Sequence, residues 1–189
     1  MDKKLNIIPT EFSGLYIIEP NLFEDERGAF GRLFCEDELK DIFKFNIKQI
    51  NHSVTKEKGT VRGLHFQYEP YAEIKMVRCI RGAVLDVVVD IRKDSPTFLQ
   101  HFSVELTEQN QKMIYIPKGF AHGFQTLKDN TELLYLHSTV YAPSNEGVLN
   151  VDDPLLNIKW PLNIINLSAR DETHPYLTDE FEGVEVNEL

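Results

Sequence analysis

Cysteine is scarce in this chain of 189 residues, and long apolar runs are missing. Two cysteines, Cys35 and Cys79, are too few for a disulfide framework, so we expect a protein of a reducing cytoplasm. No stretch approaches the roughly 18 consecutive apolar residues that a membrane-spanning helix needs. Residues 5–11 are too short and too polar to form the core of a signal peptide. The sequence therefore predicts no membrane partner.

Basic residues are outnumbered, because 30 Asp and Glu against 20 Lys and Arg give a net charge of −10. Seven of the acids lie in residues 171–189, which contain no Lys or Arg, so residues 1–170 hold 23 acids against 20 bases. Nucleic-acid binding depends on clustered Lys and Arg, so no nucleic-acid partner is predicted. The nearly balanced body permits a basic pocket for a small anion, and the acidic tail from about residue 172 is expected to aid solubility.

Short alternating or β-branched segments recur along the chain between Gly, Pro, Asn and Asp residues. This pattern predicts an all-β sandwich or barrel with few helices, built as a single domain over the whole chain. The segment 83–92 places Leu85 and Val87 on one face and Asp86 and Asp90 on the other. We expect strands over residues 14–19, 47–54, 60–67, 74–80, 83–92, 102–106, 112–116 and 132–141, and one helix over 36–43.

Side chains that could carry chemistry gather in five segments, which are residues 59–67, 73–82, 116–124, 134–137 and 167–171. In a regular strand, His65 and Gln67 share one face and Arg62 the other, unless Gly63 marks a bulge. Farther along, Tyr135 and Tyr141 are expected on one strand face.

The first three of these segments resemble, in their spacing, the two motifs of the cupin jelly roll. Many cupins use those motifs to hold a metal ion with three His and one Glu. On that pattern His65 and His122 stand at ligand positions, whereas Gln67 replaces the second His and Lys75 replaces the Glu. Lysine is cationic and offers only hydrogen-bond donors, so we expect no metal and a fixed positive charge in its place.

Longer ordered matches resemble one family, the dTDP-4-dehydrorhamnose 3,5-epimerases, which are metal-free cupins that act on nucleotide-linked 4-keto-6-deoxy sugars. The resemblance implies a cupin jelly-roll sandwich, an isomerase of polysaccharide biosynthesis, no cofactor, a nucleotide-diphosphate sugar substrate and a homodimer. The matches are residues 23–30, 49–53, 62–65, 90–98, 116–124, 153–154, 158–161 and 167–171.

The resemblance also implies roles for individual residues. His65 is implied as the general base with Asp171 as its carboxylate partner, Tyr135 as the acid on the opposite face of the sugar ring, and Lys75 as a cation near the keto oxygen. The implied substrate contacts are Arg27, Phe30, Gln49, Asn51, Arg62, His122, Tyr141, Glu146 and Arg170, of which Arg27 and Phe30 complete the pocket of a partner subunit.

These residue types suit the chemistry. Protons at C3 and C5 flank the C4 ketone and are acidic only when the resulting enolate is stabilised. An imidazole, with an ordinary pKa of about 6.5, suits their abstraction at neutral pH. A carboxylate on its other nitrogen fixes the tautomer, and a positioned ammonium stabilises the oxyanion. Inversion then requires a proton from the other face.

Three residues depart from the family pattern: Arg32 stands where many members have Glu, Glu73 where Gln is common, and Leu136 where Lys is common. The departures do not alter the implied base, acid and cation. They leave undecided which nucleotide and which sugar the protein binds. We interpret His52 and His137 as structural.

The leading hypothesis is a 3,5-epimerase of dTDP-4-dehydro-6-deoxy-D-glucose. The alternatives are an epimerase of C3 or C5 alone on another nucleotide sugar (GDP or CDP, hexose or heptose), a non-catalytic nucleotide-sugar binding cupin, and a metal cupin, which Gln67 and Lys75 oppose.

Overall fold

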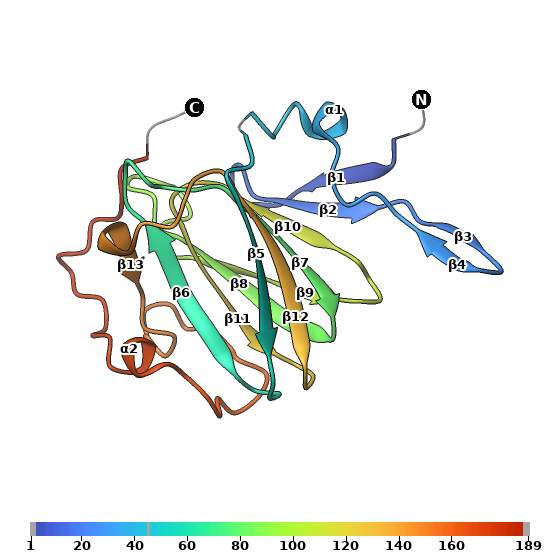
Figure 1. Cartoon of the computed structure of the whole chain (residues 1–189). Coiled ribbons are helices and arrows are strands. Elements are labelled where there is room, and N and C mark those ends of the chain that lie inside the picture. The colour runs from blue at the N-terminus through green and yellow to red at the C-terminus, as the bar shows by residue number, and fades with distance from the viewer. Residues whose placement is uncertain (1–2, 45, 187–189) are drawn as a thin grey trace.

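Two facing antiparallel sheets and a separate hairpin make up the computed structural model, which describes residues 3–44 and 46–186 (Figure 1). The larger sheet contains, in order, β1 (Leu5–Pro9), β2 (Tyr16–Pro20), β10 (Met113–Ile116), β7 (Lys75–Arg81), β12 (Thr131–His137) and β5 (Gln49–Thr55). The smaller sheet contains β13 (Glu146–Val148), β6 (Val61–Gln67), β11 (Phe120–Thr126), β8 (Ala83–Asp90) and β9 (His101–Thr107). The hairpin is β3 (Phe23–Asp25) and β4 (Gly28–Phe30), and the short helices are α1 (Glu36–Leu39), the 3-10 helix Pro143–Asn145 and α2 (Ala169–Glu172).

The expected all-β jelly-roll sandwich with a few short helices is confirmed. Strand β8 shows how alternation builds it, because Val87 and Val89 face outward into one cluster and Val88 faces inward between the sheets. Among the described residues, no helix has both the length and the apolar character needed to cross a membrane.

Three apolar clusters hold the layers together. The central cluster fills the space between the sheets with residues such as Val77, Val88, Ile114 and Leu133. The other two lie on the outer faces of the sheets, which a simple two-layer sandwich would leave in water. Each outer face is therefore covered by a segment with little regular structure.

The outer face of the larger sheet is covered by the segment around α1, where Leu39 and Phe43 pack against Met76 and Met113. The predicted helix over 36–43 is shorter in the structure, because α1 ends at Leu39. No side chain caps its first turn, and the chain leaves the helix in a turn that keeps Phe43 on the sheet.

The outer face of the smaller sheet is covered by the C-terminal segment, residues 149–186. Leu156, Phe181 and Val184 pack against the outward side chains of β6 and β8, and Val184 forms a bridge with Arg92. Residues 173–186 of the acidic stretch thus lie along the body of the molecule. This covering also brings residues 166–171 to the edge of the gap between the sheets, where the cavity described below opens.

Strand β12 is shorter than predicted. It ends at His137, so Tyr141 belongs to the following loop and does not share its face with Tyr135. Strands β1, β3, β4, β11 and β13 were not among the predicted elements.

Candidate active site

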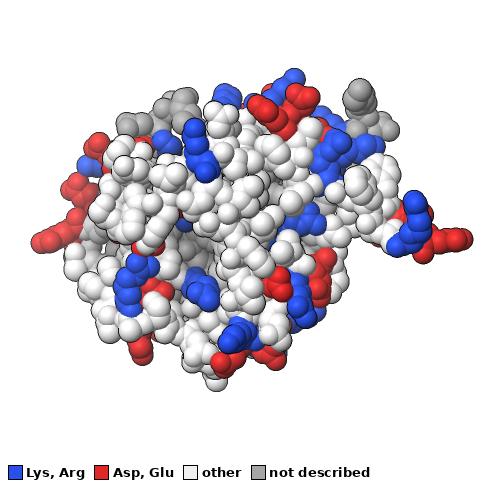
Figure 2. Space-filling view, viewed as in Figure 1, with Lys and Arg blue, Asp and Glu red and all other residues white. Residues whose placement is uncertain are grey.

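A cavity of about 1040 Å³ opens between the two sheets, lined by β5, β7 and β12 on one side and by β6, β11 and residues 166–171 on the other. Figure 2 shows a hollow in this face of the molecule, with Lys and Arg side chains near its margin. The cavity brings together eight predicted site residues: Asn51, Arg62, His65, Lys75, His122, Tyr135, Arg170 and Asp171.

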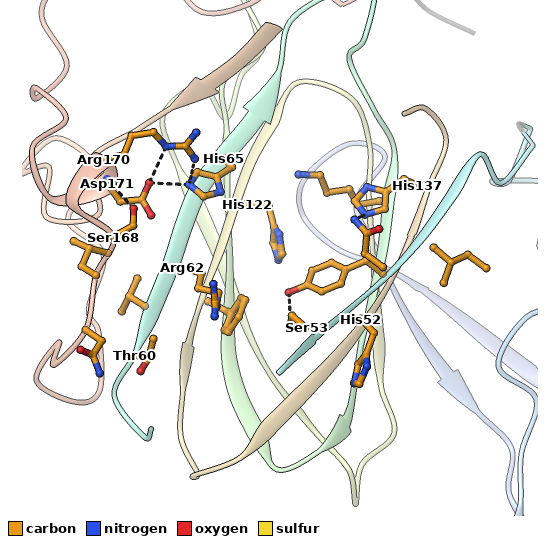
Figure 3. Close-up of a pocket in the computed structure, with 18 residues that line it drawn as sticks. His52, Ser53, Thr60, Arg62, His65, His122, His137, Ser168, Arg170 and Asp171 are labelled. Atoms are coloured by element: carbon orange, nitrogen blue, oxygen red, sulfur yellow. Dashed lines mark hydrogen bonds and ion pairs between the residues drawn. The ribbon is translucent and has the colours of Figure 1, made fainter. Parts of the chain in front are cut away.

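His65 lies on β6 and meets Asp171 at the first turn of α2. Its Nε2 donates to Asp171 Oδ1 at 2.8 Å, and Arg170 Nη2 lies 3.1 Å from the same nitrogen (Figure 3). A carboxylate only accepts and a guanidinium only donates, so Nε2 cannot bond both at once, and the shorter contact with Asp171 assigns the proton to Nε2. Neutral His65 then keeps its lone pair on Nδ1, which is the nitrogen that can accept a proton.

Asp171 is almost fully buried, and two hydrogen bonds hold it in place. Ser168 Oγ caps α2 by accepting from the Asp171 backbone N–H at 3.1 Å, so the capping pattern and the contact with His65 occur together. Burial alone would raise the pKa of Asp171, but the hydrogen bond and the charge of His65, the bond to Ser168 and the charge of Arg170 outweigh it. The pKa of this carboxyl therefore lies below its usual value.

A bulge at Gly63 turns Arg62 toward the cavity. Cross-strand partners are His122 with His65 and Phe124 with Arg62, so β6 has one residue more than β11 across this interval. Gly63 has φ +128°, and a Cβ there would lie 2.5 Å from the Gly123 Cα. The bulge considered from the sequence is confirmed, and it allows Arg62 and His65 to line the same cavity.

Tyr135 lies on the opposite wall, on β12. Its hydroxyl shares a hydrogen bond of 3.2 Å with Ser53 Oγ of β5, and its ring meets that of His122 edge to face with centroids 6.4 Å apart. Burial raises the pKa of Tyr135, so the phenol is protonated at neutral pH. Figure 3 shows His65 and Ser53 on opposite sides of the cavity with His122 between them.

His122 hydrogen-bonds a buried carboxylate, Asp86, which the sequence did not indicate as a site residue. Its Nε2 hydrogen-bonds Asp86 Oδ2 at 2.9 Å, and Asp86 is fully buried on β8. Burial raises the pKa of Asp86, whose Oδ1 has no partner among the described residues. The hydrogen bond to Asp86 therefore fixes the orientation of the His122 ring, which lines the cavity.

Lys75 and His137 are joined by Glu73. The carboxylate lies 2.9 Å from Lys75 Nζ and 2.7 Å from His137 Nδ1. Burial alone would raise the pKa of Glu73, but the charge of Lys75 and the hydrogen bond from His137 lower it. His52 and His137, which we interpreted from the sequence as structural, both line the cavity.

A second cavity of about 200 Å³ adjoins the first and shares Asn51, His65, Lys75 and His137 with it. It adds the predicted residues Gln49, Tyr141 and Glu146. Glu146 accepts hydrogen bonds from the Tyr141 hydroxyl at 2.9 Å and from Arg170.

Arg27 and Phe30 lie elsewhere. They belong to the β3–β4 hairpin, which projects from the body in Figure 1, and Phe30 is 75% exposed. Within the described ranges, neither residue lines the two cavities of its own chain. Arg27 instead forms a surface ion pair with Asp25.

The two residues that replace cupin metal ligands have other partners. Gln67 donates to the Tyr71 backbone carbonyl at 3.0 Å and accepts from the Ala142 N–H at 2.6 Å. Lys75 donates to Glu73. In the part of the chain that the structure describes, no group of three or more His, Cys, Asp or Glu side chains could hold a metal ion.

Comparison with known proteins identifies the family of this chain. The family model described as dTDP-4-dehydrorhamnose 3,5-epimerase matches residues 9–179. This chain belongs to that family. The resemblance inferred from the motifs is confirmed, and so is the prediction of an isomerase.

Several members of the dTDP-4-dehydrorhamnose 3,5-epimerase family are close in sequence and structure. The enzyme of that name from Salmonella typhimurium is 42% identical over 174 residues, which cover 90% of this chain and 94% of the relative. The dTDP-6-deoxy-D-glucose-3,5-epimerase from Legionella pneumophila, solved in complex with dTDP-4-keto-L-rhamnose, gives a TM-score of 0.89 at 36% identity over 97% of this chain and 100% of that one. A 3′-monoepimerase from Streptomyces bikiniensis, solved with dTDP-quinovose, gives 0.83 at 35% identity over 89% and 86%.

The contact between His65 and Asp171 predicts a pH-dependent contribution to the stability of this epimerase-family protein. We expect Asp171→Asn to lower the free energy of unfolding at pH 7 by about 2 kcal/mol, because it removes a charged hydrogen-bond acceptor. A carboxyl whose pKa is lowered by folding stabilises the protein above its unfolded value of about 3.9, and this stabilisation is lost as the pH falls below it. Urea unfolding of the wild-type protein and of Asp171→Asn, from pH 7 down to below the unfolded pKa, measures the difference in their free energies of unfolding. This difference should shrink in acid, and a difference that does not change with pH would contradict the expectation.

Proposed function

We propose that this protein inverts C3 and C5 of dTDP-4-dehydro-6-deoxy-D-glucose to give dTDP-4-dehydro-L-rhamnose. One observation carries the proposal: the cavity has an imidazole paired with a buried carboxylate on one wall and a protonated phenol on the other. The names of the relatives, which are dTDP-sugar epimerases with most of their length matched, support the same substrate.

Proton abstraction falls to His65. Its Nδ1 removes the proton at the carbon next to the ketone, and the imidazolium that forms is stabilised by Asp171 at 2.8 Å from Nε2. The electron pair moves onto the keto oxygen, so the intermediate is an enolate. Lys75, on the cavity wall, stabilises that oxygen by donating a hydrogen bond to it, and His122 lines the same cavity.

Tyr135 returns a proton from the opposite face of the ring. Its buried hydroxyl is protonated and is oriented by Ser53, and protonation from this face inverts the carbon. His65 then releases its proton to solvent and Tyr135 regains one, which restores the base and the acid. The same two groups can then act at the second carbon, since C3 and C5 both adjoin the ketone. The reaction consumes no oxidant or reductant and needs no cofactor.

The nucleotide part is assigned to the basic and aromatic residues at the rim. Arg62 and Arg170 are suited to the diphosphate, because a guanidinium binds phosphate oxygens with two hydrogen bonds. Gln49, Asn51, Tyr141 and Glu146 hold the sugar and the nucleoside. We place the protein in the cytoplasm as a homodimer. The exposure of Phe30 and Arg27 supports an arrangement in which the β3–β4 hairpin of one subunit reaches the pocket of the other.

A single-centre epimerase is the second candidate, favoured by the 3′-monoepimerase among the similar structures. Both functions require the same base and acid, and they differ in whether one or both of the carbons next to the ketone are inverted. Substrates carrying GDP or CDP remain alternatives to dTDP.

Incubation of the protein with the dTDP-linked 4-keto sugar in deuterated water tests the proposal. We expect NMR to show deuterium at both C3 and C5 together with the L-sugar, and His65→Ala to abolish both while the protein stays folded. Deuterium at one carbon alone would identify a monoepimerase. No exchange on dTDP, GDP or CDP sugars that still bind would contradict enzymatic function, and full turnover by His65→Ala would contradict the base assignment.

Replacing Tyr135 with Phe separates abstraction from inversion. We expect deuterium to enter with retention of configuration, because His65 remains, while formation of the inverted product falls by about a hundredfold or more. Comparison of the exchange rate with the epimerisation rate in one NMR time course measures this. An unchanged rate of epimerisation would show that another group supplies the proton.

A further inference from the structure

One carboxylate in the pocket is shared between two basic side chains. Glu73, just before β7, accepts from Lys75 Nζ with Oε1 at 2.9 Å and from His137 Nδ1 with Oε2 at 2.7 Å. The side chains of Glu73, Lys75 and His137 are only 9%, 11% and 10% exposed. Each oxygen of this nearly buried carboxylate therefore has its own donor.

A chain of hydrogen bonds runs from Gln49 through Asn51 and His137 to Glu73, and each donor in it faces an acceptor. His137 Nε2 lies 3.4 Å from Asn51 Nδ2, and Asn51 Oδ1 accepts from Gln49 Nε2 at 3.2 Å. An amide nitrogen only donates, so His137 Nε2 accepts and the proton of the neutral ring is on Nδ1. The directions of these bonds are consistent from Gln49 to Glu73.

We propose that Glu73 is a positioning residue that holds the ammonium of Lys75 in place, and that His137 fixes Glu73 by donating from Nδ1. The inference rests on the proposed function, in which Lys75 stabilises the enolate oxygen. A lysine has four flexible carbon–carbon torsions, and misplacement of a catalytic group by about 1 Å costs roughly a hundredfold in rate. Because His137 holds one oxygen of Glu73, the other oxygen can fix the position of the Lys75 ammonium before the substrate binds.

A glutamine at position 73 could not make both of these contacts. A glutamine has one acceptor and one donor at the end of its side chain. If its oxygen accepted from Lys75, its NH₂ group would face the Nδ1–H of His137, so two donors would oppose each other. Only a carboxylate accepts from both groups at once.

Glu73→Gln tests the proposal in the deuterium assay, with Glu19→Gln as the matched control. Glu19 also pairs with a lysine, Lys112 Nζ at 2.9 Å, but neither residue is among those that line the two cavities. We expect Glu73→Gln to lower kcat at least about tenfold with KM within about twofold, because Lys75 acts only on the transition state.

The control is expected to stay within about twofold of wild type in both constants. A wild-type kcat for Glu73→Gln, or an equal fall in the control, would overturn the proposal. If Glu73→Gln does not fold, Glu73→Asp keeps the charge but is one methylene too short to reach both partners, and it should show the same fall in kcat; wild-type turnover by that variant would equally overturn it.

The tautomer of His137 gives a readout that needs no substrate. Long-range ¹H–¹⁵N spectra of the histidine rings should show His137 protonated on Nδ1 alone in the wild-type protein and should lose this signature in Glu73→Gln. A wild-type ring protonated on Nε2, or exchanging between the two forms, would overturn the proposal. An inactive protein with the Nδ1–H form intact would instead contradict the proposed function.

Discussion

The hydrogen bond between His65 and Asp171 joins residues 106 positions apart in the chain, and the rest of the pocket is arranged around it. It exists because the smaller sheet presents apolar side chains on its outer face as well as its inner one. Residues 149–186 cover that outer face, and their path brings Ser168, Arg170 and Asp171 to the opening between the sheets. The apolar contacts of the C-terminal segment thus place the carboxylate that is proposed to pair with the base.

The pocket is polar inside an apolar sandwich, and three buried carboxylates are each offset by a neighbouring base. Asp171 meets His65, Asp86 meets His122, and Glu73 meets both Lys75 and His137. Unpaired charges in so enclosed a site would be costly to desolvate. The pairing also fixes rings and torsions, so that the groups proposed to act on the sugar are held before it binds.

Much of this architecture could be predicted from the sequence, because alternation in segments such as β8 is a local signal. Strand β11 was not predicted: every one of its residues is buried, so it shows no alternation. The motifs identified His65, Lys75, Tyr135 and Asp171, but not Asp86, which shares its face with core valines. Its role depends on its contact with His122 on the neighbouring strand, which no local pattern reveals.

The central claim is that a 4-keto sugar sits between an imidazole base and a phenolic acid on opposite walls. A crystal structure of this protein with a dTDP-linked sugar in the cavity tests it most directly. We expect C3 and C5 of the ring to lie with one face toward His65 and the other toward Tyr135, and the C4 oxygen to lie within hydrogen-bonding distance of Lys75. A sugar bound outside this cavity, or one with both side chains on the same face of its ring, would contradict it.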